Sequence, residues 1–427
     1  MTEITLNHIT KIEGHARLHV VVNKGKIEKC DLGSVEGSRY FEGLLKGRNY
    51  DEASEISSRI CGICSCAHTV AAIMAVEDAL KIKVSEQTKQ LRDLLTLSER
   101  IRSHATHLYF LALPDYLGYE SALAMVDKYK KEVLAALKMM KVGNEMVKII
   151  GGRDLHPVSC TVGGFLKLPK TEQLRELAIQ LESILSLAES TVKLFCSLKY
   201  SDVKYPTEYM SLKNAKEYGM LRGDIVIGKE TFAQKEFHSF IAEYHEPYST
   251  ANFVVKDGKR YMVGSLARFN HNRSQLMPKA KRALESLKWT WPQTNPFMNV
   301  PAQAIELLHS IEHSIRLCKS MTIHDEPAPH ISFPRKGGHG IAAIEVPRGV
   351  LWHEYTIEDD GTISYANIVT PTAQNLKNMQ EDIREQLPSL LKLPQASINL
   401  EIEKLIRAYD PCFSCSTHFL EVDWEEK

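Results

Sequence analysis

Two cysteine pairs at opposite ends of the chain are the residues best suited to chemistry. Cys61 and Cys64 form one Cys-x-x-Cys pair, and Cys412 and Cys415 form the other. Four thiolates supplied as two short chelates make a soft, roughly tetrahedral metal site. The sequence therefore predicts that the two ends of the chain meet around a metal.

A structural zinc site is the commonest use of four cysteines in two pairs. Zinc ribbons and knuckles usually close loops of tens of residues, whereas about 350 positions separate these two pairs. The chain is also long enough to bury a core without a metal staple. The spacing therefore disfavours zinc, which stays open as an alternative that metal analysis would decide.

Composition limits the class of protein. The chain has 427 residues, of which 44% are hydrophobic and 25% charged, as is typical of a globular protein in water. Its 53 basic and 53 acidic side chains balance, so no electrostatic footprint for nucleic acid is present, and we expect no membrane span. The odd number of cysteines, nine, and an amino terminus without a secretory signal favour the reducing cytoplasm, where cysteines serve metals rather than disulfides.

Hydrophobic periodicity predicts strands near the ends of the chain and helices in its middle. The expected segments are N-terminal strands at about 1–40, a helical core at about 70–200 and 279–325, a strand-containing excursion at about 201–275, and a C-terminal hairpin and helices at about 348–418. No repeat or linker interrupts them. We therefore expect an α+β, mainly helical fold, with one large domain over 1–427, a central bundle of long helices and small peripheral β-sheets.

The last expected helix directs the chain toward the second cysteine pair. Apolar side chains recur there at helical steps, in Ile398, Ile402, Leu405, Ile406 and Tyr409. Pro411 cannot continue this helix. We therefore expect Cys412 and Cys415 in the turn just beyond it.

The residues around both pairs resemble a family signature. Arg59-x-Cys61-Gly62-x-Cys64-x-x-x-His68 and Asp410-Pro411-Cys412-x-x-Cys415-x-x-His418 are similar to the paired motifs of the catalytic large subunit of nickel-iron hydrogenases. Other matching segments are Ile12-Glu13-Gly14-His15, Tyr40-Phe41-Glu42, Asn295-Pro296-Phe297, Pro347-Arg348-Gly349, and Pro371-Thr372 with Asn375. The chain length, Ala112-Leu113-Pro114-Asp115-Tyr116 and Cys415-Ser416-Thr417-His418 are most similar to the alpha subunit of the cytoplasmic NAD(P)-linked bidirectional enzymes, also called sulfhydrogenases.

The resemblance implies a bimetallic centre that splits H2 reversibly into protons and electrons. In the family, one cysteine of each pair is terminal on nickel, and the other bridges to an iron that carries carbon monoxide and cyanide. By position, Cys61 and Cys412 would be terminal, and Cys64 and Cys415 bridging. The Cys412 thiolate could take the first proton. Soft thiolates suit nickel, and heterolytic cleavage also needs a nearby base and a dry pocket.

The resemblance also assigns catalytic roles to three charged side chains. Glu13 matches the relay glutamate that passes protons between the terminal cysteine and solvent, the alternative being an exposed carboxylate at the end of a strand. Arg348 matches the arginine above the bimetallic centre, the alternative being a surface ion pair. Asp410 matches the second acid among the carboxylates around the centre.

Other matched residues would contact the cofactor. Thr372, after Pro371, would donate a hydrogen bond to a cyanide, or else cap the helix that follows. His68 closes the first motif. Ser103 is a departure, because many relatives carry an aspartate at this position, so the ring of carboxylates around the centre is thinner here.

The chain end carries a second expected site. Glu42, His418 and the carbonyl of Ile368 resemble the ligands of a magnesium ion that pins the carboxyl end. In the family a nickel-dependent protease cuts just after the histidine. We therefore expect 419–427 to be a removable tail, although an ordinary exposed terminus remains the alternative.

Electron transfer requires partner subunits. Beyond the four site cysteines, the chain has no ferredoxin-type cysteine run, no Gly-x-Gly-x-x-Gly fingerprint and no P-loop. We therefore expect no iron-sulfur cluster or flavin in this chain. The resemblance implies an iron-sulfur small subunit, flavin- and NAD(P)-linked or ferredoxin-linked diaphorase subunits, and maturation protease and metal-insertion factors.

A second alternative is a quinone-binding role. The quinone-site subunit of respiratory complex I shares the expected fold but lacks the four ligand cysteines. The presence of all four in this sequence counts against that role.

Overall fold

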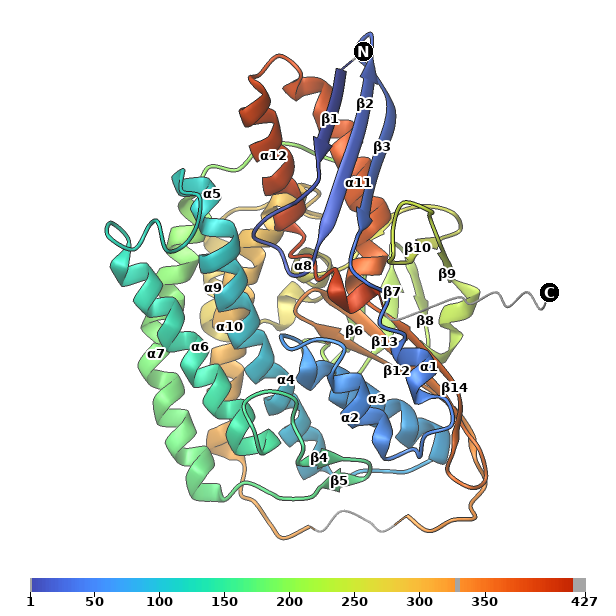
Figure 1. Ribbon diagram of the computed structural model, residues 1–427. Helices are drawn as coiled ribbons and strands as arrows, with labels where there is room; N and C mark the ends of the chain where they lie inside the picture. Colours follow the sequence, from blue (N-terminus) through green and yellow to red (C-terminus); the bar gives the residue numbers. More distant parts are fainter. Residues whose placement is uncertain (1, 327–330, 418–427) are drawn as a thin grey trace, which may run out of the picture.

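The computed structural model describes residues 2–326 and 331–417 (Figure 1). Long helices fill the left part of the view and small β-sheets lie mainly at its top and right, so the expected α+β, mainly helical fold is confirmed. None of the helices in these residues is both long enough and apolar enough to cross a membrane.

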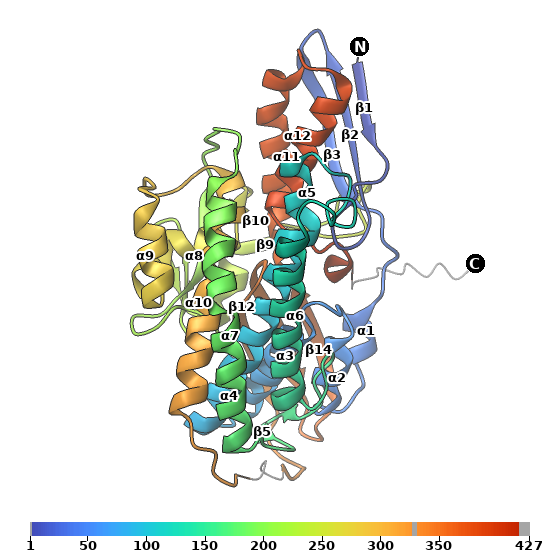
Figure 2. The same cartoon turned by 90° about the vertical axis from the view of Figure 1, so that its left-hand side faces the viewer.

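The helices fall into a long and a short group. The long helices are α3 (Ser65–Leu80), α4 (Glu86–Thr106), α6 (Lys130–Gly151), α7 (Thr171–Ser197), α10 (Asn299–Ser320), α11 (Pro371–Leu390) and α12 (Gln395–Ala408). The short helices are α1 (Phe41–Leu45), α2 (Glu52–Ser58), α5 (Leu113–Leu117), α8 (Ser265–Asn272) and α9 (Pro278–Ser286). Figure 2 shows α4, α6, α7 and α10 running side by side.

Three of the β-sheets are formed by different parts of the sequence: the N-terminal part, the C-terminal part and the excursion at about 201–275. The N-terminal sheet has the antiparallel order β1 (Thr2–Leu6), β2 (Ala16–Asn23), β3 (Lys26–Ser34). The C-terminal sheet has the antiparallel order β12 (Gly338–Val346), β13 (Gly349–Ile357), β14 (Ile363–Val369). The excursion forms the order β11 (Tyr261–Met262), β6 (Glu208–Lys213), β7 (Asp224–Ile227), β8 (Glu230–Phe232).

Two smaller sheets complete the set. They are β9 (Ile241–Tyr244) with β10 (Phe253–Lys256), and β4 (Cys160–Thr161) with β5 (Gly164–Phe165). Short 3-10 turns lie at Gln234–Ser239, Arg273–Gln275, Pro296–Met298 and Ser414–Ser416.

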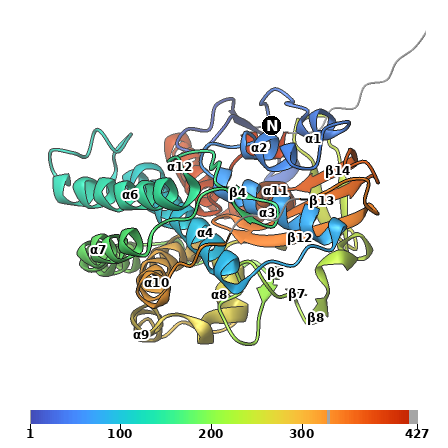
Figure 3. The same cartoon turned by 90° about the horizontal axis from the view of Figure 1, so that it is seen from below.

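Helix α4 lies between the outer helices and the C-terminal sheet, as Figure 3 shows. It packs on α6, α10 and α3. The hydroxyl of Ser85 caps it by accepting the backbone N–H of Thr88 at 3.0 Å. Every side chain from Leu91 to Ala105 is buried, and several of them are charged. Those charges need partners inside the fold, and two of them, Glu99 and Arg102, bond to the backbone on either side of Cys64.

Helix α4 continues directly into a π-helix at His107–Ala112. Such turns are rare and often occur at functional positions. The widened turn brings the His107 ring to α10 and to the end of α12. There it bonds to the Gln303 side chain, and its Nε2 lies 2.8 Å from the carbonyl of Arg407.

Some expected elements have counterparts in the structure, whereas α1, α2 and β12 were not predicted. The expected C-terminal hairpin is β13 and β14, and the last expected helix is α12. Residues 341–346 of β12 are buried, and β12 packs on α3, so it lacks the alternation of a half-exposed strand.

Candidate metal centre

The four predicted cysteine ligands meet in the interior. The sulfur atoms of Cys61, Cys64, Cys412 and Cys415 lie within 4.8 Å of one another, and all four residues are buried. Cys61 Sγ is 3.5 Å from Cys412 Sγ, and Cys64 Sγ is 3.3 Å from Cys415 Sγ. The first cysteines of the two motifs therefore face each other, and so do the second cysteines.

Local structure explains how each pair is presented. Cys61 follows α2, and Cys64 is the residue before the first turn of α3. Helix α12 ends at Ala408, and the second pair follows in an irregular turn, as the proline in its motif predicts. Both chelates thus sit on short loops that are anchored by helices.

Contact between the two cysteines of the first pair shifts their pKa values in opposite directions. The contact with Cys64 lowers the pKa of Cys61, while the same contact together with burial raises the pKa of Cys64. Cys412 and Cys415 are in sulfur–sulfur contact, as in a disulfide. As metal ligands all four would be reduced and deprotonated, because a bound cation favours the thiolate.

Glu13 reaches the second pair from the connection between β1 and β2. Cys412 Sγ lies 2.9 Å from Glu13 Oε2, and the backbone N–H of Ser414 donates to the same oxygen at 3.2 Å. The Ser414 hydroxyl donates to Glu13 Oε1. The carboxylate is half-buried, so the alternative of an exposed strand-end carboxylate is wrong.

A backbone contact fixes this approach. The N–H of Phe413 donates to the carbonyl of Glu13 at 3.0 Å. A Cβ on Gly14 would lie 2.8 Å from the backbone nitrogen of Ser414, and Gly14 has a φ of +79°. Only glycine allows these two chain segments to approach so closely in this left-handed backbone conformation.

Arg348 and Asp410 form a buried pair beside the cysteines. Arg348 Nε donates to the carbonyl of Asp410 at 2.7 Å, and Nη2 donates to Asp410 Oδ1 at 3.0 Å. Both residues are almost completely buried, so the alternative of a surface ion pair is wrong for Arg348. Burial acts to lower the pKa of Arg348, but Asp410 and the nearby cysteines raise it, so the guanidinium stays charged.

Gln303 on α10 completes the support of Asp410. Its Nε2 donates to Asp410 Oδ2 at 3.1 Å, while its oxygen bonds to the ring of His107. The aspartate has a φ of +51°, which Asp and Asn tolerate better than most residues. Sequence reasoning missed Gln303, because an isolated glutamine in a helix gives no signal.

Thr372 contacts the second pair through its hydroxyl oxygen. This oxygen accepts the backbone N–H of Cys412 at 2.8 Å and keeps its own O–H to donate. Helix α11 begins at Pro371, with Thr370 as its N-cap. Thr372 therefore lies inside the first turn, and the alternative role of a helix cap is wrong.

His68 lies behind the first pair on α3. Its backbone N–H donates to the carbonyl of Cys64 at 3.1 Å. A hydrogen bond of 3.0 Å joins His68 Nδ1 and His353 Nε2, and His353 Nδ1 lies 2.6 Å from the hydroxyl of Tyr355. This buried chain orients the His68 ring.

The expected magnesium ligands are only partly described. Glu42 Oε1 accepts the backbone N–H of Ile368 at 2.8 Å, so these two residues are neighbours. Burial is the main cause that raises the pKa of Glu42 to about 8. His418 and 419–427 lie outside the described residues.

Glu99 is a further buried acid that sequence reasoning missed. Its Oε2 accepts the backbone N–H groups of Cys66 at 2.7 Å and Ala67 at 3.1 Å, at the start of α3. Burial is the main cause that raises its pKa to about 7. Ser98, Arg100 and Arg102 make the surrounding sequence polar, so Glu99 gave no signal of burial. One turn later Ser103 is buried, and its hydroxyl has no hydrogen-bond partner among the described residues.

The donor set fits a soft metal centre with small ligands. The four sulfurs, which form the potential metal-binding group found among the described residues, suit nickel and iron as well as zinc. Arg348 Nη1, however, is buried without a hydrogen-bond partner in the described part of the chain. A buried unpaired donor calls for an acceptor, and a small anion on the metal would supply it.

Comparisons with known proteins identify the family. The sequence matches the family model described as nickel-dependent hydrogenase over residues 39–135 and 296–418. The alpha subunit of sulfhydrogenase 1 from Pyrococcus furiosus is 36% identical over 98% of this chain and 98% of its own length. The beta subunit of the NAD-reducing hydrogenase HoxS from Cupriavidus necator is 27% identical over 98% of this chain and 95% of its own.

A solved structure shares the fold. The NAD+-reducing NiFe hydrogenase in its H2-reduced state superposes with a TM-score of 0.86, covering 98% of this chain and 100% of that chain at 23% identity. The sequence matches thus weigh against the zinc scaffold and the quinone-binding subunit, which the four cysteines alone did not exclude. The chain belongs to the nickel-dependent hydrogenase family and is a nickel-iron hydrogenase, an oxidoreductase that acts on H2.

Proposed function

We propose that Cys61, Cys64, Cys412 and Cys415 hold a nickel-iron centre at which H2 is cleaved heterolytically and reversibly. Cys61 and Cys412 would be terminal on nickel, and Cys64 and Cys415 would bridge to an iron that carries carbon monoxide and cyanide. The observation that carries this proposal is the cluster of four buried sulfurs with a carboxylate oxygen 2.9 Å from Cys412 Sγ. When bound, the metals polarise H2 and take up its two electrons.

The chain's own residues move the protons. Cys412 Sγ takes one proton when H2 is cleaved and passes it to Glu13 Oε2, which is within hydrogen-bond reach. Glu13 is half-buried and contacts the Ser414 hydroxyl, so it can pass the proton on toward solvent. The second proton follows the same route after the electrons have left. Running each step backwards produces H2.

Arg348 and Thr372 act on the ligands of the iron and on the reacting H2. The buried guanidinium of Arg348, whose Nη1 has no hydrogen-bond partner in the described residues, would hold a fixed positive charge near the cysteines, where charge separates during cleavage. The Thr372 hydroxyl, which already accepts the N–H of Cys412, would donate to a cyanide on the iron. Asp410 holds the guanidinium in place. Pro371 begins α11 and His68 backs the first pair, so both shape the pocket wall.

The electrons leave through partner subunits. We place an iron-sulfur small subunit next to this chain and a flavin-containing NAD(P)- or ferredoxin-linked module beyond it, in the cytoplasm. The names of two relatives, a sulfhydrogenase alpha subunit and an NAD-reducing hydrogenase beta subunit, support a multi-subunit enzyme.

The carboxyl end carries a structural magnesium ion and a removable tail. Glu42 and the carbonyl of Ile368 would bind magnesium together with His418, and the contact between Glu42 and Ile368 supports this grouping. A maturation protease would remove 419–427 after metal-insertion factors have loaded the centre. Intact-mass measurement of active enzyme tests the tail: a chain ending at His418 is expected, and a fully active chain ending at Lys427 contradicts it.

Metal analysis tests the centre itself. We expect about one nickel and one iron per chain, together with infrared bands from carbon monoxide and cyanide on the iron. Replacement of Cys61 by serine should abolish nickel binding, whereas Cys66→Ser, which changes a buried thiol outside the four-sulfur group, should keep both metals. Stoichiometric zinc without nickel would contradict the proposal.

A further inference from the structure

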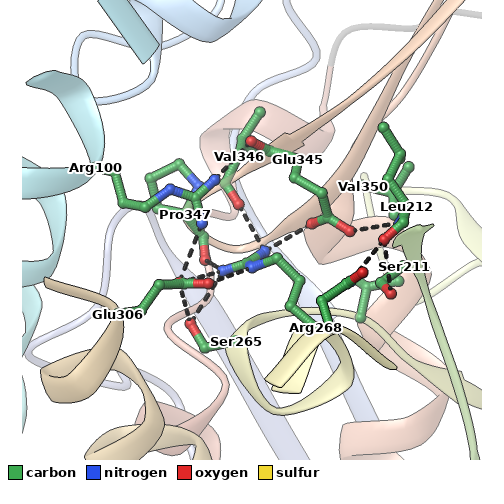
Figure 4. A network of polar contacts seen from close by, with 12 residues as sticks. Arg100, Ser211, Leu212, Ser265, Arg268, Glu306, Glu345, Val346, Pro347 and Val350 are labelled. Carbon is green, nitrogen blue, oxygen red and sulfur yellow. Dashed lines mark hydrogen bonds and ion pairs between the residues drawn. The ribbon is translucent and has the colours of Figure 1, made fainter. Parts of the chain in front are cut away.

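Two buried arginines hold the backbone just before Arg348. The carbonyls of residues 345–347 are consecutive, and each accepts a guanidinium N–H. Arg100 Nη2 donates to the first at 2.7 Å, Arg268 Nη1 to the second at 3.0 Å, and Arg268 Nη2 to the third at 2.9 Å. Figure 4 shows Arg268 directed at this stretch of backbone.

These carbonyls belong to the hairpin that carries Arg348. Val346 at the end of β12 pairs with Gly349 at the start of β13, so Pro347 and Arg348 form a two-residue turn. A Cβ on Gly349 would lie 2.3 Å from the side chain of Val263, and Gly349 has a φ of +138°. The turn therefore packs tightly against Val263 and has little conformational freedom.

Acidic side chains hold the two arginines in turn. Glu306 on α10 accepts Arg268 Nε at 2.6 Å and Nη2 at 2.7 Å, and its Oε2 lies 3.0 Å from Arg100 Nη1. Glu345 accepts Arg268 Nη1 at 2.7 Å. None of the four side chains is more than 1% exposed, and their charges cancel. Burial acts to raise the pKa of Glu306, but Arg268 and Arg100 hold it well below its usual value.

The same turn of α10 supports the partner of Arg348. Gln303, three residues before Glu306, donates to Asp410 Oδ2 at 3.1 Å. Helix α10 therefore supports Asp410 directly and Arg348 through Arg268. The buried charge cluster and the Arg348–Asp410 pair share one rigid base.

We propose that Arg268 is a positioning residue that fixes the Val346 and Pro347 carbonyls, and with them the direction in which the Arg348 guanidinium points toward the four cysteines. Its planar fork reaches two carbonyls and two carboxylates at once, which the single ammonium of lysine cannot do. The inference rests on the proposed role of Arg348. It extends the functional site by a residue on α8 that lies outside both cysteine motifs.

The test is Arg268→Lys in the complete enzyme complex. We expect nickel and iron contents equal to those of the parent, a fall in kcat of about tenfold with KM for H2 within about twofold, and faster amide hydrogen exchange in 345–350. Unchanged kcat, or unchanged exchange in that segment, would overturn the proposal.

Arg92→Lys is the matched control. Arg92 is buried on α4, forms a two-point pair with Glu77 at 2.7 and 2.6 Å, and also donates to the carbonyl of Thr161 at 3.2 Å. The Arg92→Lys variant should have a lower melting temperature than the parent enzyme but the same kcat. An equal fall in kcat in both variants would mean that Arg268 only stabilises the fold.

A double-mutant cycle separates this inference from the role of Arg348. If Arg268 acts through Arg348, adding Arg268→Lys to Arg348→Lys should lower kcat by less than about twofold further. A further tenfold loss would overturn the inference. If Arg348→Lys alone keeps the parent activity, the proposed role of Arg348 fails, while the exchange rates at 345–350 still decide whether Arg268 holds the turn.

Ser265→Ala provides a milder variant should Arg268→Lys not fold. The Ser265 hydroxyl donates to Glu306 at 2.7 Å and accepts Arg268 Nη2 at 3.0 Å, so its removal loosens the fork without changing charge. A fall in kcat of about two- to threefold with faster exchange in 345–350 is expected. Parent-like values of both would overturn the proposal.

Discussion

The two polar groups that flank the four cysteines are built in opposite ways. Arg348 on one side is buried, paired with Asp410 and supported by buried ion pairs on α8 and α10. Glu13 on the other side is half-buried, lies in a connection between strands, and touches the site through its carboxylate and one backbone carbonyl. One side is rigid and permanently charged, and the other can reach solvent.

The difference matches two kinds of chemical work. A group that stabilises separated charge acts best when it is fixed before the reaction, because no reorganisation is then needed. A group that carries protons must change its charge and its partners in each cycle. We therefore expect that, on the Glu13 side, a substitution that prevents proton uptake and release is the most harmful. On the Arg348 side, a substitution that changes the geometry of the charged group should be the most harmful.

The largest expected effect is on proton transfer. Glu13→Gln keeps size and most hydrogen bonds but cannot cycle a proton, so H2 oxidation and hydrogen/deuterium exchange should fall by about 1000-fold with nickel and iron retained. Glu36→Gln is the control, because this nearby carboxylate faces Gly14 and His15 rather than a cysteine. Normal isotope exchange in a fully metallated Glu13→Gln protein would show that protons leave by another route.

Loss of geometry at Arg348 should come next. Arg348→Lys retains the charge but loses the planar fork, so turnover should fall by about 100-fold with both metals bound. Arg222→Lys, a change at a part-exposed arginine paired with Asp93 and Glu217, should leave turnover unchanged. Activity within about twofold of the parent would mean that the Arg348 guanidinium only packs.

Asp410→Asn should have an intermediate effect. Asparagine tolerates the left-handed backbone of this position and keeps a bond to Gln303, but it loses the charge that pairs with Arg348. Turnover should fall by about tenfold, measured together with metal content. A larger loss than in Arg348→Lys would assign Asp410 a role of its own rather than one through the arginine.

The smallest effect should follow from Ser414→Ala. The Ser414 hydroxyl donates to Glu13, but its backbone N–H also does, so the carboxylate keeps part of its support. H2 oxidation should fall by about threefold. Ser416→Ala removes a hydroxyl that bonds to Thr370 instead and should have no such effect. Equal losses in both variants would point to distortion of the loop.

The cysteine ligands and Glu13 could be predicted from the sequence, whereas the residues that hold Arg348 and Asp410 in place could not. Cys61, Cys412 and Glu13 stand in short motifs whose residue types and spacing identify them. Gln303 and Arg268 contact the site region through side chains from distant helices, and such pairings leave no periodic pattern in the sequence. Strand β12 was missed for a related reason, since burial on both faces removes the alternation that marks a strand.

The separation of the two motifs also sets an order of events during synthesis. Cys61 and Cys412 meet although 351 positions separate them, and closing a loop of that length in a flexible chain costs on the order of 5 kcal/mol of entropy. A ribosome makes the second motif about 350 residues after the first, so half of the ligands are missing until then. A nascent chain therefore cannot complete the four-sulfur site early. Any chain that stops before Cys412 lacks the second chelate, so a loaded metal site shows that translation has passed the second motif.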